Sequence, residues 1–138
     1  MIIMDNKELI RLALEARKAA YVPYSGFRVG AALLTKEGKV YKGCNIENAG
    51  YTPTNCAERT AFFKAVSEGE REFAAIAIVG GKGDLPDNYA YPCGVCRQVM
   101  MEFCDPKTFR VITAISEDEY LDKTLEEMLP YGFGPSNL

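Results

Sequence analysis

The chain has 138 residues, of which 48% are hydrophobic and 25% charged, and its formal net charge is −3. These values are typical of a globular protein with a single core, so we predict one domain over residues 1–138. The acidic balance argues against a surface for nucleic acids or anionic membranes, which requires an excess of lysine and arginine. The absence of histidine excludes imidazole as a metal ligand and as a proton carrier.

The hydrophobic periodicity predicts eight elements in chain order: a helix over 5–20, strands over 27–35 and from residue 40, a helix over 56–68, a strand over 73–79, a helix from 92 or 93 to 103 or 104, a strand over 110–115 and a short helix over 125–129. Asp5 is expected to cap the first helix and Gly69 to close the second. This order predicts a central sheet with helices on both faces, a three-layer α/β/α sandwich.

The cysteines and the N-terminal residues predict a cytoplasmic protein. Residues 1–4 are too short for a signal sequence, because charged residues follow at once, and no apolar run is long enough to span a membrane. The chain has five cysteines, an odd number, and without an export signal they are expected to stay reduced. Clustered cysteines in such a chain are better explained by metal binding or catalysis than by disulfides.

The strongest local pattern is Cys56-Ala57-Glu58 followed at a distance by Pro92-Cys93-Gly94-Val95-Cys96. Three thiolates can hold a zinc ion and leave its fourth position to water, whose proton a nearby carboxylate can accept. Both parts of the pattern begin a predicted helix, where exposed N–H groups favour thiolate over thiol. If the two helix N-termini converge, the three sulfurs meet around one point. Glu58 can share their pocket only if Cys56 lies at the helix entry.

The cysteine pattern alone also permits a redox dithiol or a structural zinc site. A structural site would normally contain a second cysteine pair, whereas Cys44 and Cys104 stand alone and are most simply small core residues. A redox motif would leave Cys56 and its neighbouring glutamate unexplained. Three thiolates and Zn²⁺ carry a net charge of −1, which Arg59 or Arg97 can offset by donating hydrogen bonds to the sulfurs, and Arg59 is favoured; the alternative is that both arginines are solvated surface residues.

Five segments make the chain resemble the small homotetrameric cytidine deaminases of pyrimidine salvage over nearly its whole length. They read YSGFRVGAAL (24–33), GCNIENA (43–49), CAERTA (56–61), PCGVCRQV (92–99) and LPYGFGP (129–135). Several ordered signatures at the right separations are far more specific than any one motif. The resemblance implies a cytidine-deaminase-like sandwich whose central mixed sheet has about five strands.

The resemblance also implies the chemistry. Cytidine or 2′-deoxycytidine would be hydrolysed to uridine or 2′-deoxyuridine with release of ammonia, using one zinc ion per chain. Cys56, Cys93 and Cys96 would bind the zinc, and Glu58 would carry protons from water to the base and to the leaving amine. The protein would be a homotetramer with pockets shared between subunits.

By the same resemblance, Asn45 and Glu47 would bind the ribose, Phe27 would pack on the base, and Ala57 would offer a backbone contact. Phe133 would reach a neighbouring subunit's pocket. Around the ligands the family pattern places Arg59 and Gln98. From the residues alone, Phe27 reads more readily as core, the Asn45/Glu47 pair as turn capping and the C-terminal phenylalanine as part of a disordered end.

Three other functions could use a similar zinc site. A nucleic-acid-editing deaminase needs a basic groove and stacking aromatics, which the net charge of −3 and the absence of tryptophan oppose. A deaminase of a cytosine-containing antibiotic of the blasticidin type is less favoured, because the Asn45/Glu47 pair and Phe133 are intact. A non-enzymatic zinc module would not need Glu58.

Tyr91 and residues 52–55 depart from the family pattern and bear on substrate range. The sequence leaves the preference between cytidine and deoxycytidine open.

Overall fold

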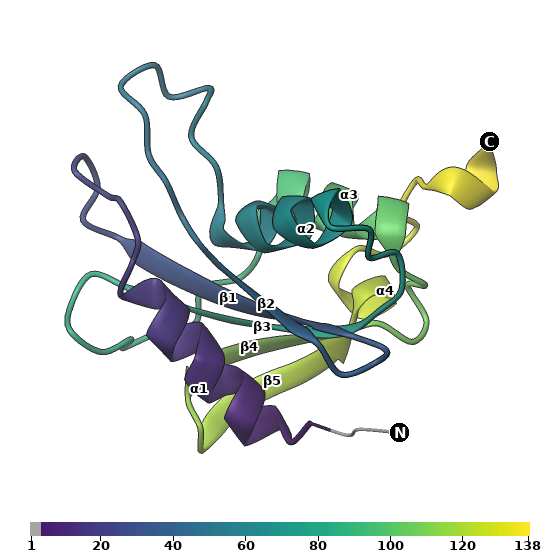
Figure 1. The fold of residues 1–138 in the computed structure, drawn as a ribbon, viewed down its shortest axis with the longest axis horizontal. Helices are drawn as coiled ribbons and strands as arrows, with labels where there is room; N and C mark the ends of the chain where they lie inside the picture. Colours follow the sequence, from purple (N-terminus) through teal and green to yellow (C-terminus); the bar gives the residue numbers. More distant parts are fainter. Residues whose placement is uncertain (1–3) are drawn as a thin grey trace.

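The computed structural model describes residues 4–138; Met1, Ile2 and Ile3, part of the apolar segment considered as an export signal, lie outside the described residues. A twisted sheet forms the centre of the molecule, and helices lie on both of its faces (Figure 1). The elements in chain order are α1 (Asn6–Arg17), β1 (Arg28–Thr35), β2 (Val40–Cys44), α2 (Ala57–Ser67), β3 (Phe73–Gly81), α3 (Gly94–Phe103), β4 (Arg110–Ser116), β5 (Glu119–Thr124), α4 (Leu125–Met128) and a short 3₁₀ helix (Pro135–Asn137).

The five strands form one mixed sheet in the order β2-β1-β3-β4-β5. β1 pairs antiparallel with β2 and with β3, and β4 pairs antiparallel with β5. β3 and β4 are parallel, and α3 lies in the crossover between them, as a parallel connection requires. β3 is buried along nearly its whole length, which confirms the prediction of a strand covered on both faces.

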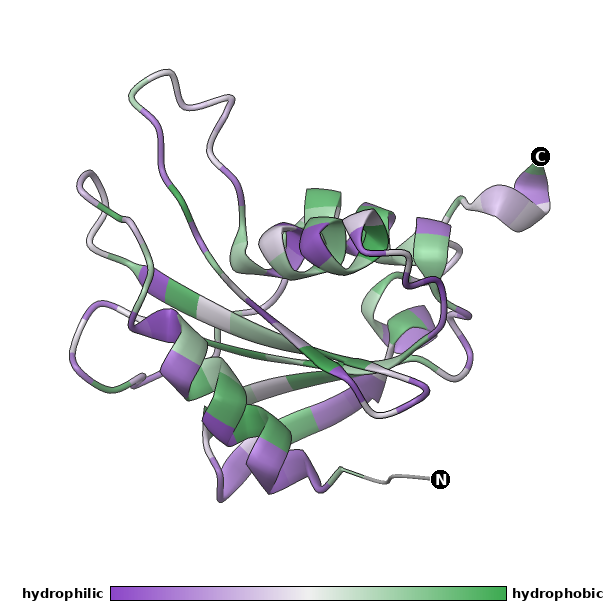
Figure 2. Cartoon of the chain, viewed as in Figure 1, coloured by the Kyte–Doolittle hydropathy of each residue, from purple (hydrophilic) through white to green (hydrophobic). Residues whose placement is uncertain are grey.

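The core is divided by the sheet into two layers. On one face α1 packs its buried residues Leu9, Ile10 and Ala13 against the strands, and Figure 2 shows hydrophobic and hydrophilic residues side by side on this helix, as its amphipathic sequence predicts. On the other face α2 and α3 cover the sheet around Phe62 and Met100, both fully buried. The predicted three-layer α/β/α sandwich is therefore confirmed.

Two glycines allow the helices to lie directly on the sheet. A Cβ atom at Gly30 in β1 would lie 2.1 Å from the carbonyl oxygen of Ala13 in α1. A Cβ atom at Gly43 in β2 would lie 2.4 Å from the carbonyl oxygen of Ala57 in α2. Since no real Cβ is tolerated at such distances, any larger residue at either position must push its helix away from the sheet.

The differences from the predicted elements lie mainly at the C-terminal end. The predicted element order contained only four strands and missed β5. This edge strand is nowhere fully buried, so its polar sequence lacks an apolar alternation. The first helix ends at Arg17, earlier than predicted, while the Asp5 side chain accepts from Lys7 N as its cap. Gly69 takes a positive φ of 99° after α2, as predicted. No helix within residues 4–138 has the length and apolar character that crossing a membrane requires.

Candidate zinc and nucleoside site

Two helix N-termini bring the three predicted ligand residues together. Cys56 is the N-cap of α2 and Cys93 the N-cap of α3, both with extended backbone, and the buried Cys96 lies in the first turn of α3. The three sulfur atoms all lie within 4.8 Å of one another, and the sulfurs of Cys56 and Cys93 are 3.8 Å apart. Neither cap side chain bonds to its own helix, so these sulfurs point free of the helix ends.

The sulfurs have the electrostatics of a cation site. The Cys96 thiol, and after it the Arg59 guanidinium, donate hydrogen bonds to the Cys56 sulfur and lower the pKa of Cys56 to about 5. The same contact with Cys56, together with burial, raises the pKa of Cys96 well above its usual range. Three thiolates this close repel each other, and a divalent cation removes that repulsion. Among residues 4–138 the cluster offers three sulfur ligands for a metal ion. Zinc usually takes four ligands, so the three sulfurs fit a zinc ion with one position left for water.

The structure distinguishes the two arginines that follow the ligands. Arg59 Nη2 lies 3.2 Å from the Cys56 sulfur and donates to it. Arg97 contacts no sulfur among the hydrogen bonds of the described chain; its Nε donates to the carbonyl oxygen of Pro92 at 2.7 Å, and its Nη1 to that of Met128. Arg59 therefore offsets the thiolate charge, whereas Arg97 fixes the backbone that leads into Cys93.

The carboxyl group of Glu58 is almost completely buried beside the sulfurs, with 4% of the residue exposed. Because Cys56 stands at the helix entry as N-cap, Glu58 in the first turn can face the same cavity. Burial, and to a lesser extent the neighbouring Cys56 charge, raises the pKa of Glu58 to about 7. A carboxyl with this proton affinity can both accept and donate a proton near neutral pH.

A cavity of about 270 Å³ opens next to the ligand residues. Its walls are mostly apolar, with a few polar groups among them, which is the usual composition of a small-molecule site. The lining residues are Phe27, Val29, Asn45, Thr54, Asn55, Cys56, Ala57, Glu58, Ile78, Ala90, Tyr91 and Cys93. Phe27 is 37% exposed and borders the cavity, so its interpretation as a core residue was wrong.

Asn45 and Glu47 each hold the backbone of a neighbouring loop. Asn45 Oδ1 accepts from Val29 N at 2.9 Å, and its Nδ2 donates to the carbonyl oxygen of Phe27 at 2.8 Å. Glu47 Oε1 accepts from the backbone N–H groups of Tyr24 and Ser25, at 3.0 and 3.1 Å, and its Oε2 accepts from the Ser25 hydroxyl. These bonds, the one from the Ser25 hydroxyl first among them, lower the pKa of Glu47. Both side chains retain hydrogen-bonding capacity for a ligand.

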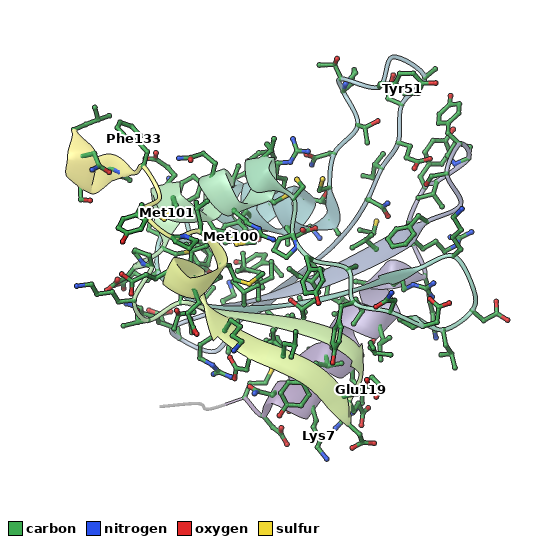
Figure 3. All side chains as sticks on the ribbon, turned by 180° about the vertical axis from the view of Figure 1, so that it is seen from behind. Lys7, Tyr51, Met100, Met101, Glu119 and Phe133 are labelled. Atoms are coloured by element: carbon green, nitrogen blue, oxygen red, sulfur yellow. The ribbon has the colours of Figure 1, made fainter. Side chains whose placement is uncertain are left out.

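Glu47, Gln98 and Phe133 do not line this cavity; Glu47 lines a second one, which shares Thr54 with it. The exposed Gln98 donates from Nε2 to the carbonyl oxygen of Phe133 at 2.8 Å rather than to a sulfur, because two positions beyond Cys96 it faces another side of α3. Phe133 is 58% exposed on the C-terminal segment, which projects from the body of the molecule (Figure 3). Gln98 thus supports the C-terminal segment, a correction to its expected place around the ligands.

Other cavity residues were not foreseen from the sequence. Val29 and Ile78 come from the apolar strands β1 and β3, and Ala90 from the loop after β3. A wall residue and a core residue in such a strand have the same sequence pattern, so no local signal separates them. Tyr91 and Thr54, in contrast, border the cavity as expected of residues bearing on substrate range.

An α/β/α sandwich that presents three thiolates and a buried carboxyl at one cavity defines a class of zinc proteins suited to activating water. Comparison with known proteins is consistent with this class. Residues 4–112 match the family model of the cytidine and deoxycytidylate deaminase zinc-binding region. The chain belongs to this family.

Its similarity to individual members extends along almost the entire chain. It is 52% identical over 131 residues to a cytidine deaminase of Halalkalibacterium halodurans, covering 94% of this chain and 95% of the relative. It is 48% identical over 135 residues to a cytidine deaminase of Sporosarcina psychrophila, covering 98% and 96%. The crystal structure of cytidine deaminase from Burkholderia pseudomallei superposes with a TM-score of 0.86 at 47% identity, covering 94% of this chain and 100% of that one. The resemblance found in the sequence is thereby confirmed.

Proposed function

We propose that this protein is a cytidine deaminase that hydrolyses cytidine and 2′-deoxycytidine to uridine and 2′-deoxyuridine with release of ammonia. The observation that carries the proposal is the meeting of three cysteine sulfurs within 4.8 Å of one another beside the buried carboxyl of Glu58. The relatives named cytidine deaminase support the substrate, since they match the chain over nearly their full length.

Cys56, Cys93 and Cys96 would hold the zinc ion of this family. When bound, zinc supplies the Lewis acidity that makes a water molecule a stronger acid near neutral pH. Arg59 donates a hydrogen bond to the Cys56 sulfur and so reduces the negative charge of the ligand set. A less negative ligand set favours deprotonation of water, which three unneutralised thiolates would oppose.

Glu58 performs the proton transfers in this proposal. Its carboxylate accepts a proton from the attacking water and delivers it to N3 of the cytosine ring, while the oxygen attacks C4. The same group then helps to protonate the amine that leaves from C4 as ammonia. Burial suits the residue to both steps, because it raises the proton affinity of the carboxylate.

Further residues in the cavity and beside it orient the nucleoside. Phe27 and Ala57 both line the cavity; the Phe27 ring would pack on the base, and Ala57, buried at the start of α2, would offer a backbone contact. Asn45 and Glu47 would bind the ribose with the donors and acceptors that their loop contacts leave free. Both cytidine and deoxycytidine carry a hydroxyl that this pair can bind, so both are expected substrates.

We also infer that the protein acts in the cytoplasm as a homotetramer whose pockets are shared between subunits. The support is the C-terminal segment, which carries the exposed aromatic residues Tyr131 and Phe133 away from the body of the chain (Figures 1 and 3). Exposed aromatic surface on an ordered segment is unfavourable in water and is stabilised by packing against another chain. Phe133 would then complete the pocket of a neighbouring subunit.

Glu58→Gln tests the function directly. The amide keeps the shape of the side chain but cannot accept a proton, so turnover of cytidine should fall by about 10²–10⁴-fold or more. Zinc content should remain at that of the wild type, because Glu58 is not among the clustered donors. The measurement is the loss of cytidine absorbance together with metal analysis of the purified protein. Near wild-type turnover in the variant would contradict the role assigned to Glu58, and a wild-type protein inactive on both nucleosides would contradict the function.

A further inference from the structure

Arg17, the last residue of α1, is an arginine buried without a charged partner. Only 4% of the residue is exposed, and no carboxylate within residues 4–138 forms an ion pair with it. Its guanidinium donates instead to four backbone carbonyl groups. Nε donates to the carbonyl oxygen of Arg28 at 3.1 Å and Nη1 to that of Asp84 at 2.9 Å, while Nη2 donates to those of Gly81 and Gly83.

Such a contact needs the geometry of arginine as well as its charge. A buried cation without a carboxylate is unfavourable, and burial lowers the pKa of Arg17 accordingly. The four carbonyl oxygens replace the lost water, and they do so in the plane of one rigid guanidinium. A lysine ammonium has three donors on one nitrogen and cannot reach all four oxygens in this arrangement. The site is therefore built around one particular side chain.

The four carbonyls belong to segments that meet at one end of the sheet. Arg28 begins β1, Gly81 ends β3, and Gly83 and Asp84 open the loop over residues 82–91. Figure 1 shows the end of α1, the start of β1 and this loop together on one side of the molecule. One side chain thus ties the helical layer on one face of the sheet to the loop that leads to the cavity on the other.

The segments that Arg17 joins both lead to residues of the cavity wall. Phe27 directly precedes Arg28, and the loop ends in Ala90 and Tyr91, which line the cavity with it. The loop folds back so closely that a Cβ atom at Gly80 would lie 2.8 Å from the Ala90 Cβ and 3.1 Å from the Phe27 ring. Small displacements of residues 82–91 are therefore transmitted to Phe27 and to the part of the cavity wall that Ala90 and Tyr91 form.

We propose that Arg17 is a positioning residue for nucleoside binding, which it serves by holding Phe27 and the 82–91 loop in their places in the cavity wall. This inference rests on the proposed function, in which the base occupies that cavity. The metal ligands do not depend on it, because Cys56 and Cys96 belong to α2 and α3, and Arg97 fixes the backbone before Cys93. Loss of Arg17 should therefore weaken substrate binding in ground and transition state alike, which raises KM and changes kcat little.

The test compares Arg17→Lys with Arg11→Lys in the zinc-loaded protein. Arg11 lies on the same helix but is exposed, its Nε contacts Glu117 at 2.6 Å, and neither residue lines the cavity, so its replacement is a matched control. For Arg17→Lys we expect KM for cytidine to rise about tenfold, as for the loss of a net hydrogen bond or two, with kcat within about threefold. Arg11→Lys should leave KM within about twofold. Arg17→Met, which also removes the charge, should raise KM at least as much.

Hydrogen–deuterium exchange of the backbone amides gives a readout independent of activity. Amides of residues 82–91 should exchange faster in Arg17→Lys than in Arg11→Lys, while those at the starts of α2 and α3 keep their protection and zinc content is unchanged. An unchanged KM, or equal exchange of the loop in the two variants, would overturn the proposal. A wild type that does not turn over cytidine would instead overturn the proposed function, and the exchange comparison would still decide whether Arg17 holds the loop.

Discussion

Arg59 and Arg97 both follow a proposed ligand closely in the sequence, yet only the guanidinium of Arg59 contacts a sulfur. Its Nη2 donates to Cys56, and its Nε is buried without a hydrogen-bond partner among the described residues. Arg59 is therefore expected to contribute to metal affinity through charge and orientation of the ligand, without binding the metal itself.

Arg59→Gln should lower zinc affinity by roughly 10–100-fold, the usual cost of losing a partner of a metal ligand. The physical reason is that the thiolate set loses its only contacting cation among the described residues, so the Cys56 sulfur is less stabilised in its charged form. Competition with a chromophoric chelator measures the affinity. Arg97→Gln serves as control, because it removes two bonds to backbone carbonyls and none to sulfur. Equal losses of affinity in the two variants would contradict this assignment.

The residue scale also shows which site groups the sequence reveals. The pattern of Cys56, Cys93 and Cys96 predicts a shared cation, because three thiolates at two converging helix N-termini can hold a zinc ion. The choice between Arg59 and Arg97 could not be made, since it depends on the direction in which each side chain leaves its helix. Arg17 gives no signal in the sequence, because its partners are backbone carbonyls of Arg28 and of residues 81–84, and a backbone carbonyl is present whatever the side chain.

At the scale of elements, the position of α2 on the sheet determines where Cys56 and Glu58 lie. Gly43→Ala should displace this helix, because the added Cβ would lie 2.4 Å from the Ala57 carbonyl oxygen, between those two residues. Overpacking of this kind costs about 1–3 kcal/mol in the free energy of unfolding. Moving the start of α2 away from that of α3 should also reduce bound zinc and kcat. Urea unfolding, metal analysis and steady-state kinetics measure the three effects.

Gly30→Ala is the matched control on the opposite face of the sheet. Its added Cβ would lie 2.1 Å from the Ala13 carbonyl oxygen in α1, so a comparable loss of stability is expected. Because α1 carries none of the proposed ligands, zinc content should be preserved. If Gly43→Ala retained full zinc and full kcat while both variants were destabilised, the position of α2 would not control the site.

The elements themselves were largely predictable, and the exceptions have a physical cause. β1 and β3 are buried on both faces and therefore consist of apolar runs that the sequence reveals. β5 is one of the two edge strands, with exposed or half-buried side chains throughout, and its polar sequence carries no alternation to detect. Its existence followed only from the resemblance to a family with about five strands.

For the whole molecule, the sequence predicted the three layers, whereas the cavity depended on how those layers meet. Helix and strand order fix a sandwich because each amphipathic element must bury one face. The cavity walls, however, combine Phe27, Ile78 and Ala90 from three separate segments, and local periodicity contains no record of that arrangement. The C-terminal segment leaves the aromatic side chains of Tyr131 and Phe133 exposed, and in the proposed homotetramer a neighbouring chain would cover them.

If pockets are shared, two inactive or weakened variants should complement each other. Phe133→Ala keeps Glu58 but lacks the ring offered to a neighbour, whereas Glu58→Gln keeps that ring but cannot transfer protons. A site in a mixed oligomer can combine the intact glutamate of one chain with the intact phenylalanine of the other. Co-expression should therefore give sites with wild-type KM for cytidine, and light scattering should give a mass of four chains of 15.3 kDa each. Activity equal to the sum of the separate variants, or a monomeric mass, would show that each chain builds its pocket alone.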